Sequence, residues 1–155
     1  MPILETRTLH WSDEAACAAS ARSLAARPQI GEATIELRGT LGAGKTTFAR
    51  QLLRALGVEG RVKSPSYAVV EPYTLAGGGS AWHFDFYRFD DPREWEDAGL
   101  RELYAARGLK IAEWPEKAEA ALPEPDLRID LAVAHGQARR ATFTALTARG
   151  RELLP

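Results

Sequence analysis

The chain has 155 residues, of which 45% are hydrophobic and 26% are charged, and its formal net charge at pH 7 is −1. This length and composition predict one globular, soluble domain. The near-zero charge gives the chain as a whole no electrostatic drive toward nucleic acid or membranes, and the single cysteine excludes an internal disulfide.

The sequence contains no signal for a membrane or for secretion. No apolar run approaches the roughly 20 residues that a membrane-spanning helix needs. The first ten residues, MPILETRTLH, lack the basic segment and apolar core of a signal peptide. We therefore expect no membrane contact and a cytoplasmic location.

The first predicted elements are a strand and a helix. Residues 3–10 alternate loosely and predict an edge strand. Ser12 is a candidate N-cap for an Ala-rich helix that ends near Ala26, before Pro28. Cys17 lies in this helix, where a small buried residue is a better interpretation than a reactive thiol.

The next segment has the order strand, loop, helix. Residues 33–38 (ATIELR) form a strand-like run, and residues 47–56 carry apolar side chains at helical spacing, with Gly57 placed to end the helix. The loop between them reads GTLGAGKT. It matches the pattern of Gly, four residues, Gly, Lys and then Ser or Thr, through Gly39, Gly44, Lys45 and Thr46.

Each residue type in this loop suits phosphate binding. Glycines let successive backbone N–H groups curl around phosphate oxygens, and a helix that starts directly after the loop adds further N–H donors. Lys45 is expected to reach the β- and γ-phosphates, and the Thr46 hydroxyl to bind Mg²⁺. The alternative, a Gly-rich turn with a solvated lysine, does not require the flanking strand and helix.

The remaining elements alternate between strands and helices. Residues 67–75 and 81–87 predict a hairpin with a turn at 77–79, in which Pro72 indicates an edge strand or a bulge. One helix is expected from residues 91–92 to Gly108, with Trp95, Leu100, Leu103 and Tyr104 as its buried side. A central strand at 109–114, a short helix at 116–121 and a hairpin of 127–133 with 139–146, turning at 135–137, complete the chain. The pattern predicts an α/β fold: a single P-loop NTPase domain over residues 1–155, with a mostly parallel central sheet, flanking helices and antiparallel hairpin additions.

Two acids lie near the ends of predicted strands, where P-loop proteins place carboxylates beside the phosphate loop. Asp85 lies in AWHFDFY and Glu113 in LKIAEW, each among apolar residues. An acid in such surroundings usually has a specific partner, although either could face solvent on the polar side of its strand. His83 and Arg88 flank Asp85, and for His83 a structural and a functional role are equally open.

Other features narrow the class of nucleotide protein. The hydroxyls of residues 64–66 (Ser-Pro-Ser) could sense a γ-phosphate, or the segment could be a simple turn. The chain has no asparagine, so it lacks the Asn-Lys-x-Asp motif with which GTPases read guanine. No second Gly-rich loop or Arg-dense lid is evident, which counts against a small-molecule kinase of the P-loop class. Such a kinase is nevertheless the main alternative to an ATPase. A further alternative is a binding protein that holds a nucleotide without hydrolysing it.

Several motifs together resemble one family. The segments GTLGAGKTTFAR, VKSPSYAVVEPY, HFDFYR, IAEWPEK and LPEPDLRI, between about Ile35 and Ile129, closely resemble the TsaE family of P-loop ATPases in bacterial tRNA threonylcarbamoyladenosine synthesis. The resemblance implies ATP and Mg²⁺ as cofactors, and slow hydrolysis that depends on partners. Those partners are TsaD and TsaB homologues, whose complex modifies adenosine 37 of ANN-decoding tRNAs; contact with tRNA is expected only through that complex.

The resemblance also implies a set of site residues. Asp85 and Glu113 are the implied catalytic acids, and Thr46 and Glu113 the implied metal ligands. The residues implied for ATP are Gly39, Leu41, Gly42, Ala43, Gly44, Lys45, Thr46, Thr47, Ser66 and Trp114. Ser66 departs from the family, which usually has threonine there, but the hydroxyl survives.

Overall fold

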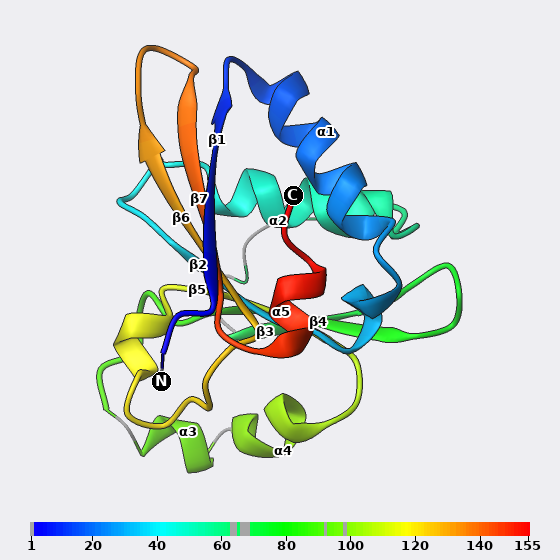
Figure 1. Cartoon of the computed structure of the whole chain (residues 1–155). Helices are drawn as coiled ribbons and strands as arrows, with labels where there is room; N and C mark the ends of the chain where they lie inside the picture. The colour runs from blue at the N-terminus through cyan, green and yellow to red at the C-terminus, as the bar shows by residue number, and fades with distance from the viewer. Residues whose placement is uncertain (1, 63–64, 66–68, 92, 98) are drawn as a thin grey trace.

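Seven strands form one sheet in the order β1-β7-β6-β2-β5-β4-β3 (Figure 1). The computed structural model describes every residue except 1, 63–64, 66–68, 92 and 98. The inner strands β6, β2, β5 and β4 run parallel, while β7 and β1 at one edge and β3 at the other are antiparallel to their neighbours. The predicted α/β class with a mostly parallel centre is confirmed.

The strands are β1 (Glu5–Trp11), β2 (Thr34–Arg38), β3 (Val70–Thr74), β4 (Ser80–Asp85), β5 (Leu109–Glu113), β6 (Leu127–Val133) and β7 (Arg139–Ala145). The helices are α1 (Glu14–Ala25), α2 (Lys45–Ala55), α3 (Glu94–Asp97), α4 (Leu100–Ala105) and α5 (Ala148–Glu152), with 3₁₀ helices η1 (Pro28–Glu32) and η2 (Pro115–Ala118). The predictions did not include η1 or α5, and η2 replaces the short helix expected at 116–121. The first residues of the strand expected at 67–75 lie outside the described part of the chain.

Burial explains the position of each strand. All five residues of β5 are buried, as expected for a strand between two parallel neighbours with both faces covered. Pro72 lies in β3, which pairs only with β4, so its missing N–H faces the free edge of the sheet. The sequence prediction of an edge strand there is confirmed.

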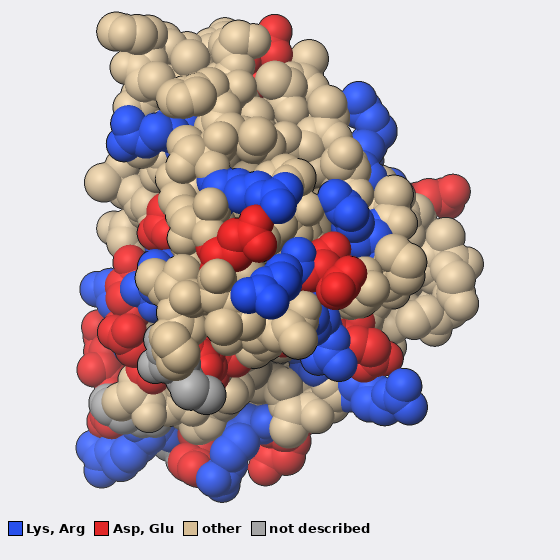
Figure 2. Space-filling model, in the orientation of Figure 1, with Lys and Arg blue, Asp and Glu red and all other residues tan. Residues whose placement is uncertain are grey.

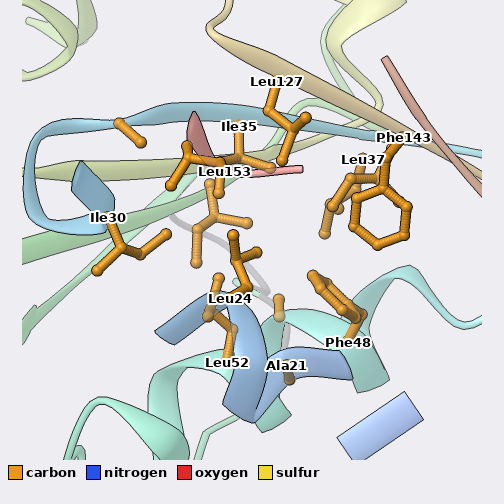
Figure 3. Close-up of a cluster of buried hydrophobic side chains, with 14 of the residues drawn as sticks. Ala21, Leu24, Ile30, Ile35, Leu37, Phe48, Leu52, Leu127, Phe143 and Leu153 are labelled. Carbon is orange, nitrogen blue, oxygen red and sulfur yellow. The ribbon is translucent and has the colours of Figure 1, made fainter. Parts of the chain in front are cut away.

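Helices α1 and α2 cover one face of the sheet (Figure 1). Between them and the strands lies the main apolar core, in which Leu24, Leu52 and Phe48 meet Ile35 and Leu127 (Figure 3). The side chain of Asp13 accepts a hydrogen bond of 2.9 Å from the N–H of Ala16 and caps α1. The predicted cap, Ser12, was wrong by one residue.

A second apolar cluster covers the opposite face beneath β4 and β5. It is built from aromatic side chains of β4 and the following turn, packed on Trp95, Leu100 and Tyr104 of α3 and α4. The single helix expected here is wrong, because Gly99 adopts a left-handed conformation (φ 68°) and α4 begins directly after it. The chain thus makes two short helices where the apolar spacing alone predicted one.

This topology places the ends of four strands at one edge of the sheet. Because β6, β2, β5 and β4 are parallel, their carboxyl ends lie together, and α2 starts just after β2 at that same edge. Among the described residues, no helix is long and apolar enough to cross a membrane.

Candidate functional site

The loop between β2 and α2 has a backbone that depends on glycine. Gly39 has φ 150°, and a Cβ atom built there would lie 2.5 Å from the carbonyl oxygen of Leu131 on β6. No other residue fits that position. Gly44 is the N-cap of α2, which therefore begins at Lys45, two residues earlier than predicted. The N-terminus of α2, with its partial positive charge, consequently lies at the end of the loop.

Lys45 is buried, and protein groups surround its ammonium. Its Nζ donates to the carbonyl oxygen of Gly39 and, at 3.1 Å, to that of Thr40. The same nitrogen lies 4.0 Å from the centre of the Trp114 ring. Burial is the main cause that lowers the pKa of Lys45, while neighbouring carboxylates, first among them Glu113, act in the opposite direction. The ammonium is poised to exchange these weak acceptors for a stronger anion.

Thr46 and Glu113 meet although they are far apart in the sequence. The Thr46 hydroxyl lies 2.9 Å from Oε1 and 3.0 Å from Oε2 of Glu113 and donates to the carboxylate. Glu113 is the last residue of β5 and is buried. The structure therefore brings together the two residues that the sequence predicted as metal ligands.

Asp85 ends the neighbouring strand, β4, directly beside Glu113. The two residues are register partners in the parallel β4–β5 pair. Oδ1 of Asp85 accepts a hydrogen bond of 3.0 Å from the N–H of Tyr87. Burial is the main cause that raises the pKa of Asp85 above its ordinary value, and the nearby Glu113 acts in the same direction. The pair thus provides two carboxylates in one half-buried place.

His83 belongs to this group of side chains, whereas Arg88 does not. Nε2 of His83 lies 2.6 Å from Oε2 of Glu113, with both side chains buried. Arg88 is exposed in the turn that follows β4 and is not among the described residues that line the pocket.

An open pocket of about 260 Å³ lies beside the start of α2, with Lys45, Thr46, Asp85 and Glu113 in its wall. Its described lining residues are Leu41, Gly42, Gly44, Lys45, Thr46, Thr47, Asp85, Tyr87, Glu113 and Trp114. Nine of them were predicted site residues. Tyr87 was not predicted as one; its ring lies 4.9 Å from that of Trp114. Gly39 belongs to the same loop but is not among the described lining residues, and Ser66 lies outside the described residues.

Trp114 has an unusual backbone conformation. Its φ of 54° is the only positive value of a non-glycine residue in the described part of the chain. Such conformations cost about 1–3 kcal/mol and cluster at functional sites. The turn aims the indole ring across the pocket at Lys45 and Tyr87.

A second pocket, of about 270 Å³, lies on the other side of the phosphate loop. Its described lining residues are Trp11, Asp13, Glu14, Cys17, Ala43, Gly44, Thr47, Gln137 and Arg139. It shares Gly44 and Thr47 with the first pocket, so the two pockets adjoin at the start of α2. Ala43 was predicted as a site residue and lies here.

Arg139 connects this second pocket to the phosphate loop. Its Nε donates to the carbonyl oxygen of Ala43 at 3.0 Å, and Nη1 donates to those of Gly136 and Ala138 at 2.9 and 3.0 Å. Sequence reasoning missed Arg139 because no motif marks it. The sequence feature that could have pointed to Arg139 is its position at the start of the last predicted hairpin strand.

The donor set near Thr46 suits Mg²⁺ better than a softer metal. A hydroxyl and carboxylates offer only oxygen, the ligand that Mg²⁺ prefers. Within the described residues, no group of three or more His, Cys, Asp or Glu side chains could hold a metal ion. Mg²⁺ commonly uses one or two carboxylates together with substrate phosphates, and Glu113 and Asp85 are the two carboxylates here.

Comparisons with known proteins identify the family of this chain. The sequence model of the family described as "Threonylcarbamoyl adenosine biosynthesis protein TsaE" matches residues 11–141. The tRNA threonylcarbamoyladenosine biosynthesis protein TsaE of Haemophilus influenzae is 39% identical over 120 residues, which are 77% of this chain and 75% of that protein. The protein of the same name from Bacillus subtilis is 38% identical over 112 residues, 72% and 69% of the two chains.

A solved structure resembles the whole fold. The crystal structure of Bacillus subtilis YdiB matches with a TM-score of 0.80 and 27% sequence identity, over 99% of this chain and 94% of that one. The family model spans most of the chain, and the two TsaE relatives exceed 30% identity. The chain therefore belongs to the TsaE family.

Proposed function

We propose that this protein binds ATP with Mg²⁺ and hydrolyses it slowly, as an accessory ATPase of tRNA threonylcarbamoyladenosine formation. The single observation that carries the proposal is the convergence of Lys45, Thr46, Glu113 and Asp85 on one pocket at the start of α2. These residues come from three separate elements, and their meeting has no role in packing the core.

The phosphates occupy the pocket lined by the loop and α2. The first turn of α2 contains no acidic residue, so none of its own side chains offsets the partial positive charge that the helix start presents to an anion. The Lys45 ammonium is already desolvated, and a phosphate oxygen is a stronger acceptor for it than the carbonyls of Gly39 and Thr40.

The hydroxyl of Thr46 and the carboxylate of Glu113 hold the Mg²⁺ that accompanies the nucleotide. Bound Mg²⁺ supplies positive charge that offsets the charge developing on the transferred phosphoryl group. Thr46 and Glu113 already lie within 3.0 Å of each other, so little rearrangement is needed for both to face one ion.

Asp85 is the candidate residue that orients the attacking water and accepts its proton. Its carboxylate lies beside Glu113, and its raised pKa makes it a better proton acceptor than an exposed aspartate. The hydrogen bond from Tyr87 N–H to Oδ1 fixes the side chain and leaves Oδ2 to orient water. Positioning of this kind is often completed by a partner, which is consistent with slow hydrolysis by the chain alone.

The base of the nucleotide lies in the second pocket, between Trp11, Asp13 and Arg139. This pocket meets the phosphate pocket at Gly44 and Thr47, so one extended molecule can occupy both. Arg139 is held against the loop by its bonds to carbonyl oxygens and lines the second pocket beside Ala43 and Gly44. The carboxylates of Asp13 and Glu14 offer acceptors to an exocyclic amino group.

The partners that we propose are homologues of TsaD and TsaB, and contact with tRNA occurs through their complex. The TsaE relatives carry tRNA threonylcarbamoyladenosine biosynthesis in their names. The net charge of −1 gives no general affinity for RNA. On the face shown in Figure 2, basic and acidic side chains lie next to one another, which is a poor surface for binding a polyanion directly.

The test is ATP hydrolysis with Mg²⁺, by the protein alone and then with TsaD and TsaB from the same organism. We expect slow turnover alone and a clear rise with both partners. Glu113→Gln should lower the stimulated rate by about 100-fold, whereas Glu152→Gln, an equal change of charge at an exposed site, should not. ATP binding without any response to the partners would contradict the assignment. Phosphate transfer to a metabolite faster than to water would favour the kinase alternative.

A further inference from the structure

We propose that His83 is a positioning residue, which orients the carboxylate of Glu113 for Mg²⁺ through a hydrogen bond. The inference rests on the proposed function, because it assumes that Glu113 faces the metal. It gives a role to a buried histidine for which the sequence left structural and functional interpretations open.

The strand register places His83 beside Glu113. His83 pairs with Ile111, and Asp85, two residues further along β4, pairs with Glu113. Alternate residues of a strand point to the same face, so His83 and Asp85 lie on the side of the sheet where α2 begins. From there the His83 ring reaches Glu113 with Nε2 at 2.6 Å from Oε2, and the two side chains are 0% and 3% exposed.

The surroundings of the ring indicate which nitrogen carries the proton. A carboxylate oxygen only accepts, so the Nε2 atom facing Glu113 donates. Nδ1 is buried and has no partner among the described residues. With the proton on Nε2, no N–H group of the ring is left buried without an acceptor, and leaving one so would cost about 1–3 kcal/mol. His83 is thus a donor aimed at Glu113.

This donor fixes the rotation of the carboxylate. Oε2 of Glu113 accepts from His83, and Oε1 lies 2.9 Å from the Thr46 hydroxyl. Without His83, the Glu113 carboxylate loses one of its partners and can turn about its last bond. Removing a partner that orients a metal ligand commonly lowers metal affinity 10–100-fold. A histidine that only fills space would have no such effect when an apolar side chain of similar length replaces it.

The experiment compares His83→Gln with His83→Met, two unbranched side chains of nearly equal size. Glutamine can place an amide N–H near the position of Nε2, whereas methionine has no donor. Calorimetry gives the affinity for ADP in EDTA and then the Mg²⁺ concentration at which half of the Mg²⁺-dependent gain is reached. We expect that concentration to rise at least 10-fold in His83→Met and to stay within about 3-fold of the parent in His83→Gln. The affinity for ADP in EDTA should not change.

The outcomes separate the two proposals. If Mg²⁺ does not change the affinity of the parent protein for ADP, both the proposed function and the role of His83 are overturned. A parent that responds to Mg²⁺ while His83→Met matches it overturns only the role of His83. Equal loss in folded Gln and Met variants shows that packing of the ring is what matters. If His83→Met does not fold, His83→Asn replaces it as the variant without a donor to Glu113. The asparagine side chain is too short to place its amide N–H at the position of Nε2.

Discussion

The ammonium of Lys45 lies 4.0 Å from the centre of the Trp114 ring, so the first residue of α2 meets the residue that follows β5. A cation over an indole face is worth about 0.5–2 kcal/mol. The contact depends on the left-handed backbone of Trp114, which turns the ring over the pocket. The described groups in direct contact with the Lys45 ammonium are therefore a ring and two carbonyls, all weaker partners than a phosphate.

Lys45→Met should separate nucleotide binding from stability. Methionine keeps the length and packing of the side chain but removes the charge-assisted bonds to phosphate, each worth about 1.5–3 kcal/mol. We expect ATP affinity to fall about 10–100-fold by calorimetry. The midpoint of thermal unfolding without nucleotide should stay within about 3 °C, because the buried ammonium itself is costly to desolvate.

The control for this change is Lys117→Met, which alters the charge equally at an exposed position. Its ATP affinity should equal that of the parent. Unchanged affinity in Lys45→Met would instead remove the phosphate loop from the proposed site.

Asp85→Asn should stabilise the protein near neutral pH while impairing hydrolysis. Burial raises the pKa of Asp85 above its ordinary value of 3.8, so the folded state disfavours the charged form. The parent therefore loses stability as the pH rises through the raised pKa, and asparagine has no such loss. Its Oδ1 can still accept from Tyr87 N–H.

Melting curves over a range of pH test this expectation. The variant should melt about 1–3 °C above the parent at pH 7, and the gap should close below the ordinary pKa. A variant that melts below the parent at pH 7 would show that the Asp85 charge is stabilising, contrary to the direction of its pKa.

The strand–loop–helix unit was predictable because its signals are local. The apolar spacing of residues 47–56, the glycines of the loop and the apolar run at 109–114 each reflect neighbours in sequence, and the parallel arrangement then brings Asp85 and Glu113 together. The same order of parallel strands also places Asp85 and Glu113 beside the start of α2. Of the residues that motifs mark, Lys45, Thr46, Asp85 and Glu113 are brought together, whereas Arg88 is not.

Features that depend on competition or distant contacts could not be predicted. Ser12 and Asp13 are both good capping residues, and only the path of the chain decides that Asp13 caps α1. The break at Gly99 interrupts an apolar spacing that fits one helix. The β6–β7 hairpin was predicted, but its pairing with β1, which sets Trp11 opposite Arg139, joins segments far apart in the chain and is not specified by local sequence.

Three glycine-to-alanine changes should destabilise the protein in a graded order. Gly39→Ala combines φ 150° with a Cβ atom 2.5 Å from Leu131 O, whereas Gly42→Ala meets only φ 82° with nothing within 4 Å. Gly31→Ala has neither problem. We expect losses of about 3 kcal/mol or more, about 1 kcal/mol and near zero.

Thermal unfolding without nucleotide measures this series. A loss of 3 kcal/mol corresponds to a fall of about 6–12 °C in a chain of this size. If Gly39→Ala melts no lower than Gly42→Ala, the loop does not pack against β6 as closely as the structure indicates.

Cys17 should be a slow thiol that reports on the second pocket. Burial, with a smaller contribution from Glu14, raises its pKa to about 11. At pH 8 only about one thiol in a thousand is then ionised, compared with about a quarter in an unfolded chain. Iodoacetamide should therefore label the native protein at least 100-fold more slowly than the urea-unfolded protein.

Bound nucleotide should also affect the labelling rate of Cys17, because Cys17 lines the pocket proposed for the base. ADP at saturating concentration should slow labelling of the native protein further, and inorganic pyrophosphate, which lacks a base, should protect less. Thermal stabilisation by each ligand, measured in parallel, shows how much protection comes from reduced unfolding alone. Protection by ADP that only equals this stabilisation would place the base elsewhere than between Trp11 and Arg139.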